Sequence, residues 1–138
     1  MEGRQAPYNM SAEQAVLGCM ISNSKALSEV FTEIKADDFY TEAHRLIFEA
    51  IKSLFDTGRA VDIVTVSGAL GSRIEMAGGL NYLSRLAMSV VTTENLAQHI
   101  DIIKKTSNMR KLIEAADQIS RMCYEAKEDA EVILDRAE

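Results

Sequence analysis

The longest stretch that combines an unbroken helical period with the absence of glycine and proline runs from Glu94 to Lys127, and it constrains the fold more than any other feature of the chain. Its residues keep a helical period throughout, and a helix of this length extends for roughly 50 Å at about 1.5 Å per residue. A chain of 138 residues needs no helix that long to cross its own core. We therefore expect the helix to pack on its own domain early and on something else later.

The apolar residues of this helix change sides along its length. At about 100° per residue, Leu96, Ile100 and Ile103 share one face. A second stripe lies about half a turn away and steps by three and four residues, which is the spacing of a coiled-coil seam. Its members are Met109, Leu112, Ala116, Ile119, Cys123 and Ala126. The pattern predicts packing of the first face on the chain's own core and of the second on another helix or chain. A curved helix that wraps a single core is the alternative explanation.

A charged stretch, Glu125–Glu131, follows Tyr124 and predicts a turn. A second helical pattern then begins, with Val132, Ile133, Leu134 and Ala137, and the sequence stops at Glu138 after barely two turns. Helices this short are marginal unless something packs on them. We expect a helical hairpin whose second arm is cut short, in a fragment of a longer protein.

The remainder of the chain favours short helices. With one proline and seven glycines, the chain has few of the residues that form the turns between strands, and helix-forming residues dominate. We predict an all-α fold: a flexible N-terminus over residues 1–10, a compact head of about six short helices over residues 11–93, and the hairpin over residues 94–138. The β-branched run Val61–Val66 has no partner strand elsewhere in the chain, so we read it as helical.

Local signals place several helix ends. Ser11 and Gln14 have the spacing of a capping box, and Thr41 and Asp62 are expected N-caps. Gly58 is an expected C-cap. The helix between Thr41 and Gly58 has a wide apolar face and is the predicted centre of the core.

Charge and cysteine usage exclude several classes of function. The net charge is −6, and the best basic cluster is Lys104, Lys105, Arg110 and Lys111, so we expect little direct DNA binding. No apolar run approaches the ~20 residues of a membrane span, and the first residues of this sequence lack the apolar core of a signal peptide. Cys19 and Cys123 form no metal-binding motif, and we expect two reduced, buried thiols in a cytoplasmic protein.

The chain shows no catalytic motif. His44 has no second metal-ligating residue nearby, so we expect it on a helix surface or at the rim of the core. Asp37 and Asp38 have no third carboxylate nearby, so we expect them to be solvated. Neither a phosphate-binding loop nor a nucleophile elbow is present. We therefore predict no catalytic, metal or cofactor site; an enzyme built on His44 with the two aspartates is the weakest alternative.

Several segments, taken in order, resemble those of one protein family. They are Ala12-Glu13-Gln14-Ala15-Val16-Leu17-Gly18, Asp38-Phe39-Tyr40 with His44-Arg45 and Ile47-Phe48, Val61-Asp62 with Val64-Thr65-Val66, Gly78-Gly79 with Tyr82-Leu83 and Leu86, Asn95, Arg110 with Leu112-Ile113 and Ala115, and Asp135-Arg136-Ala137-Glu138. At these distances the chain resembles the N-terminal domain of the bacterial replicative DNA helicase, the DnaB family, from about Pro7 to Glu138. One departure is His99-Ile100, where the family usually shows Tyr-Ala.

The resemblance implies an α-helical collar domain without catalysis of its own, joined by a linker to an ATPase motor that would bind ATP and magnesium and is absent from this chain. In that family the hairpins pair into dimers, three dimers form a ring, and the ring recruits the C-terminal domain of primase. We expect a helicase loader as a further partner. The alternative is the helicase-binding C-terminal domain of primase, which shares the head-and-hairpin plan.

The resemblance also nominates contact residues. Tyr82 of the G-G-x-x-Y-L motif and the apolar positions Leu112, Ile113 and Ile119 are candidates for dimer or primase contacts. Together with the stripe they form the predicted interface set: Tyr82, Met109, Leu112, Ile113, Ala116, Ile119 and Cys123.

Overall fold

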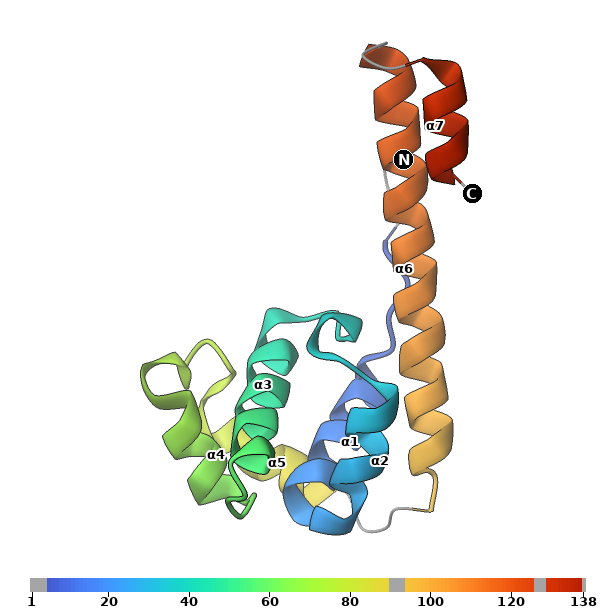
Figure 1. The fold of residues 1–138 in the computed structure, drawn as a ribbon. Coiled ribbons are helices and arrows are strands. Elements are labelled where there is room, and N and C mark those ends of the chain that lie inside the picture. Colours follow the sequence, from blue (N-terminus) through green and yellow to red (C-terminus); the bar gives the residue numbers. More distant parts are fainter. Residues whose placement is uncertain (1–4, 90–93, 126–128, 138) are drawn as a thin grey trace. The chain divides into compact units, whose positions relative to one another are not determined.

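The computed structural model describes residues 5–89, 94–125 and 129–137, and every regular element among them is helical (Figure 1). The all-α prediction is therefore confirmed. The described residues divide into two compact units. We call residues 8–107 the head unit, and residues 5–7 with 108–125 and 129–137 the hairpin unit. Each unit is described by itself.

The head unit contains five α-helices, three short 3₁₀ turns and the beginning of a sixth α-helix. The elements are α1 (Met10–Ser22), η1 (Ser24–Ala26), α2 (Leu27–Glu33), η2 (Ala36–Asp38), α3 (Glu42–Asp56), α4 (Ile63–Leu70), η3 (Gly71–Arg73), α5 (Gly79–Ser89) and the first part of α6 (Leu96–Glu125). Helix α1 packs on α5 and α3, and α3 packs on α4.

The core lies where the sequence places it, around α3. Ile47 and Ile51 are completely buried, and Phe48 and Leu54 are each 2% exposed. Phe39, which precedes α3, packs its ring against that of Phe48 with the centroids 5.2 Å apart. These large apolar side chains dominate the stability of the unit because apolar area removed from water is the main favourable term in folding.

Most of the expected helix ends are present. The Thr41 hydroxyl accepts a hydrogen bond from the backbone N–H of His44, and Asp62 and Thr65 cap each other reciprocally. Gly58 adopts a φ of +72°, which favours glycine.

The prediction that Ser11 caps the first helix is wrong. Asn9 is the cap, and its side chain accepts a hydrogen bond from Ala12 N at 2.9 Å, so α1 begins at Met10. Asn caps a helix as well as Ser does, and capping at Asn9 adds two residues to the helix.

The first part of α6 packs on the head unit as predicted. Leu96, Ile100 and Ile103 are buried, and the buried Ser107 hydroxyl donates a hydrogen bond to Asp38 at 2.7 Å. Lys104 lies 2.6 Å from Glu33, whose hydrogen bond and charge raise the pKa of Lys104 above its usual value. This ion pair is therefore intact at neutral pH, and on the basic side it is lost as the pH rises through that raised pKa.

The hairpin unit consists of the later part of α6 and of α7 (Ala130–Ala137), which lie side by side (Figure 1). Ile133 of α7 is buried, and Arg136 lies 3.5 Å from the Met122 sulfur of α6. The predicted hairpin is confirmed. Ala126 and Lys127, the predicted end of the stripe and of the long helix, lie outside the described residues.

The two cysteines differ in exposure, so the expectation of two buried thiols is wrong for Cys123. Cys19 is 2% exposed, whereas Cys123 is exposed because it lies on the outer side of α6 in the hairpin unit. Burial, and then the nearby Glu29 carboxylate, raise the pKa of the Cys19 thiol.

This difference predicts unequal thiol reactivity. Since the thiolate is the reactive form, the dilute native protein should react rapidly with Ellman's reagent at one thiol per chain and slowly at the other. The Cys123→Ser variant should lose the fast phase, whereas Cys19→Ser should keep it. A fast phase that survives in Cys123→Ser would contradict the assignment.

Candidate protein-interaction surface

Large apolar side chains remain exposed along the hairpin-unit part of α6. Met109 is 55% exposed, Leu112 65% and Ile113 48%, and Ala116 and Cys123 are exposed as well. We call these five residues the α6 stripe. Scattered exposed apolar residues are ordinary, but several on one face of a helix, as Met109, Leu112 and Ala116 are here, are typical of a helix that pairs with another helix.

Ile119 differs from the other predicted stripe residues. It is only half-buried and lines a cavity of about 410 Å³ together with Met122 of α6 and with Arg136 and Ala137 of α7. Its side chain therefore belongs to the seam between α6 and α7 and not to the exposed row. Helix α7 also presents Leu134, 63% exposed, which the set of predicted interface residues omits.

The charges near the stripe are of both signs. Glu114 and Asp117 share α6 with Arg110 and Lys111, and Arg110 donates a hydrogen bond to the carbonyl of Pro7 at 2.8 Å. A nucleic-acid surface needs clustered basic side chains that neutralise phosphates. This part of α6 is therefore suited to a protein partner.

Tyr82, the remaining predicted contact residue, lies on α5 in the head unit. A chain of hydrogen bonds holds its hydroxyl: Gln14 donates to it at 3.2 Å, and His44 Nε2 lies 2.5 Å away. His44 Nδ1 is in turn 2.7 Å from Glu13 Oε1, and Glu13 Oε2 accepts the backbone N–H of Tyr40 at 2.8 Å.

This network corrects the expectation for His44. His44 and Glu13 are each only 1% exposed, so His44 is neither a surface nor a rim residue. Because a carboxylate accepts hydrogen bonds, the geometry fits a proton on Nδ1 that is donated to Glu13, with Nε2 beside the Tyr82 hydroxyl. The Glu13 carboxylate and both ring nitrogens of His44 then each have a partner, as burial requires.

Two further contacts fix the Tyr82 ring. It stacks on the His44 ring with centroids 5.9 Å apart, and the Arg85 guanidinium lies 5.5 Å from its centroid. Gly78 allows this close packing, because a Cβ there would lie 2.6 Å from Tyr82 Cδ2, and its φ of +105° also favours glycine. The half-buried Tyr82 borders a cavity of about 220 Å³ with Arg85 and Ser89.

The predicted set thus falls in two places. Tyr82 belongs to the head unit, and the six other residues belong to the hairpin unit. Sequence reasoning missed Glu13 as the partner of His44; the signal available was a single carboxylate among the apolar residues of α1.

Within the described ranges, no three His, Cys, Asp or Glu side chains gather in a way that could hold a metal ion. Asp38 of the predicted solvated pair is 8% exposed and accepts hydrogen bonds from Ser107 and from its own turn at Lys35 N. None of the helices described is both long and apolar enough to cross a membrane.

Comparison with protein-family models and curated proteins gives a consistent result. The model described as the DnaB-like helicase N terminal domain matches residues 5–105. The replicative DNA helicase DnaB of Geobacillus stearothermophilus is 36% identical over 137 residues, which cover 98% of this chain and 30% of that protein. The corresponding protein of Mycobacterium leprae is 34% identical over 140 residues, which cover 99% of this chain and 23% of that protein.

Solved structures of DnaB-type helicases are also similar to this chain. The crystal structure of the N-terminal domain of DnaB helicase from Mycobacterium tuberculosis superimposes with a TM-score of 0.89 at 32% identity, covering 96% of this chain and 95% of that one. A DnaB-like replicative helicase, described with its interactions with primase, gives a TM-score of 0.78 at 28% identity, covering 94% of this chain and 32% of that one. The chain spans about a quarter to a third of the length of these curated relatives.

Proposed function

Because the chain belongs to the DnaB-like helicase N-terminal domain family, we propose that it is an assembly and recruitment domain of a replicative helicase, with no catalysis of its own. The observation that carries the proposal is the α6 stripe, whose three largest side chains are each about half exposed or more. The parent protein is then an ATP-dependent DNA helicase of DNA replication, and its ATP and magnesium are bound by a motor domain outside residues 1–138.

The proposed homotypic contact places the α6 stripe of one copy against that of a second. Burying the remaining exposed parts of Met109, Leu112 and Ile113 in both copies contributes roughly 5–10 kcal/mol gross, at about 1.5–3 kcal/mol for a fully buried side chain. The loss of translational and rotational freedom costs about 4–15 kcal/mol. At the favourable ends of both ranges the net gain is about 6 kcal/mol, so the stripe alone supports at best a weak dimer, with a dissociation constant on the order of 10–100 µM.

Recruitment is the second part of the proposal. The similarity to a helicase described with its interactions with primase supports the C-terminal domain of primase as a partner, and a helicase loader is a further candidate. Tyr82 is the proposed recruiting residue of the head unit, because its ring is held in place by His44 and Arg85 while one side remains partly exposed. The mixed charges of α6 support little direct DNA binding.

Cys123 provides an internal probe of self-association. Its alkylation rate should fall several-fold as the protein concentration rises through the dissociation constant, because pairing of the stripe covers the thiol. Sedimentation velocity over the same concentrations should show the matching shift from monomer to dimer. A concentration-independent alkylation rate together with a monomer at high concentration would refute the proposed contact.

A further inference from the structure

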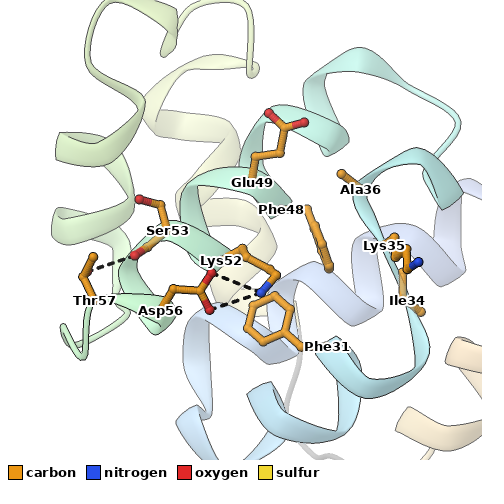
Figure 2. A pocket seen from close by; sticks show the side chains of 10 residues that line it. All are labelled: Phe31, Ile34, Lys35, Ala36, Phe48, Glu49, Lys52, Ser53, Asp56 and Thr57. Carbon is orange, nitrogen blue, oxygen red and sulfur yellow. Dashed lines mark hydrogen bonds and ion pairs between the residues drawn. The ribbon is translucent and has the colours of Figure 1, made fainter.

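A groove on the head unit shares no residue with the α6 stripe or with the Tyr82 cavity. Its volume is about 630 Å³, and it lies between α3 on one side and the end of α2 with η2 on the other (Figure 2). Its floor is apolar: the half-buried Phe31 lies over the buried Ile34 and Phe48. The remaining lining residues are Lys35, Ala36, Glu49, Lys52, Ser53, Asp56 and Thr57.

The groove is elongated along α3. Six lining residues come from α3 and its C-cap, and they lie on one face of the helix because they are spaced alternately by one and three positions. They are Phe48, Glu49, Lys52, Ser53, Asp56 and Thr57. At about 1.5 Å per residue this wall is roughly 13 Å long, which equals between two and three turns of a second helix.

The floor is formed before any ligand binds. The Phe31 ring meets the Phe48 ring edge-on with centroids 5.3 Å apart, and it also packs on Phe55 at 5.0 Å. The Lys52 ammonium lies 5.2 Å from the Phe31 centroid and 3.1 Å from the Asp56 carboxylate. Dashed lines in Figure 2 mark the contact between Lys52 and Asp56. Rings fixed in this way lose little further freedom on binding, which lowers the cost of association.

The rim carries charges of both signs. Lys52 and Asp56 pair with each other, whereas Lys35 and Glu49 take part in no ion pair within the described part of the chain. Figure 2 shows Glu49 on α3 and Lys35 at the opposite wall, with the Phe48 ring between the two walls. A groove with one unpaired cation and one unpaired anion on either side of an apolar floor is poorly matched to a polyanion such as nucleic acid.

We propose that this groove binds an amphipathic helix of a partner protein, which seats one aromatic or long aliphatic side chain on the half-buried Phe31 ring. The partner helix carries a basic residue that meets Glu49 and an acidic residue that meets Lys35. The length of the wall matches a helix lying in a groove, and the apolar floor with a charged rim is the usual anatomy of a protein interface. This inference adds a second docking surface to the proposed assembly role and does not depend on it.

The test is a selection of helix-forming peptides. A display library of 15-residue peptides, randomised on one face only, is selected against the 138-residue chain, and the binding of enriched peptides is measured by fluorescence anisotropy. The enriched peptides should have one pattern in common: a large apolar residue, with a basic residue within one helical turn on one side of it and an acidic residue within one turn on the other. Ser53→Arg, which places a long side chain over the groove, should weaken binding at least about tenfold. The same substitution outside the groove, Ser72→Arg, should leave it unchanged.

A charge exchange tests the orientation of the partner. Glu49→Lys should weaken the selected peptide about fivefold or more, and a peptide with its basic residue changed to glutamate should recover most of that loss. The proposal is overturned if no peptide is enriched, if enriched peptides lack the charge pattern, or if they bind Ser53→Arg as tightly as the unmodified chain. It is also overturned if Ser53→Arg abolishes self-association in sedimentation, since the groove would then hold a second copy of this chain.

Discussion

Replacing His44 with alanine is expected to lower the free energy of unfolding by about 3 kcal/mol, the upper end of the usual cost of leaving a buried hydrogen-bonding group without its partner. The substitution leaves the 1%-exposed Glu13 carboxylate without its side-chain partner and removes the group that contacts the Tyr82 hydroxyl. Urea denaturation followed by circular dichroism measures the change, with the slope of the transition as a check on two-state behaviour.

The chain contains its own matched control, because it has only two histidines. His99 lies on α6, half-buried, and His99→Ala should cost less than about 1 kcal/mol. Replacing Glu13 and His44 together with leucine should be less damaging than His44→Ala, because no unpaired buried carboxylate remains. A cost for His44→Ala that equals the cost for His99→Ala would show that the network contributes little to stability.

Replacing Leu112 with aspartate is expected to weaken self-association by at least about 30-fold, since burying an uncompensated charge costs about 2 kcal/mol or more. Leu112 is 65% exposed in the single chain, so the folded chain itself should be unaffected. Sedimentation velocity and the alkylation rate of Cys123, which should no longer depend on concentration, measure the effect.

The control for this variant is Gln118→Glu. It adds the same charge to α6 with almost no change in shape, on the side of the helix that faces the cavity against α7. Its dissociation constant should remain within about twofold of the unmodified chain. Ile119→Asp is a poorer test, because Ile119 lines that cavity and a charge there would disturb the hairpin itself. Equal dimerisation of Leu112→Asp and the unmodified chain would exclude the stripe as the contact.

Features encoded over a few residues were predictable. The caps at Thr41 and Asp62 depend on spacings of three residues, and the change of apolar side along α6 follows from the helical period alone. The same reasoning chose Ser11 over Asn9, because both residues can cap and the choice depends on how far the helix extends.

Features that depend on distant residues were not predictable. Glu13 and His44 are 31 positions apart, and only the packing of α1 on α3 brings them together. The groove is built by walls from two segments, and no local pattern marks it. Cys123 was assigned to a buried seam, although the seam with α7 uses the neighbouring side of the helix, at Ile119 and Met122.

The contact between Gly78 and Tyr82 has a consequence for engineering the recruiting surface. Any side chain at position 78 would collide with the tyrosine ring and would also be forced into an unfavourable backbone region. Libraries that diversify the head unit should therefore keep the glycine constant while position 82 is varied. Exchanging the tyrosine for a smaller residue would remove the ring contacts but leave the backbone restriction, so a change at position 78 is disfavoured whichever site is varied first.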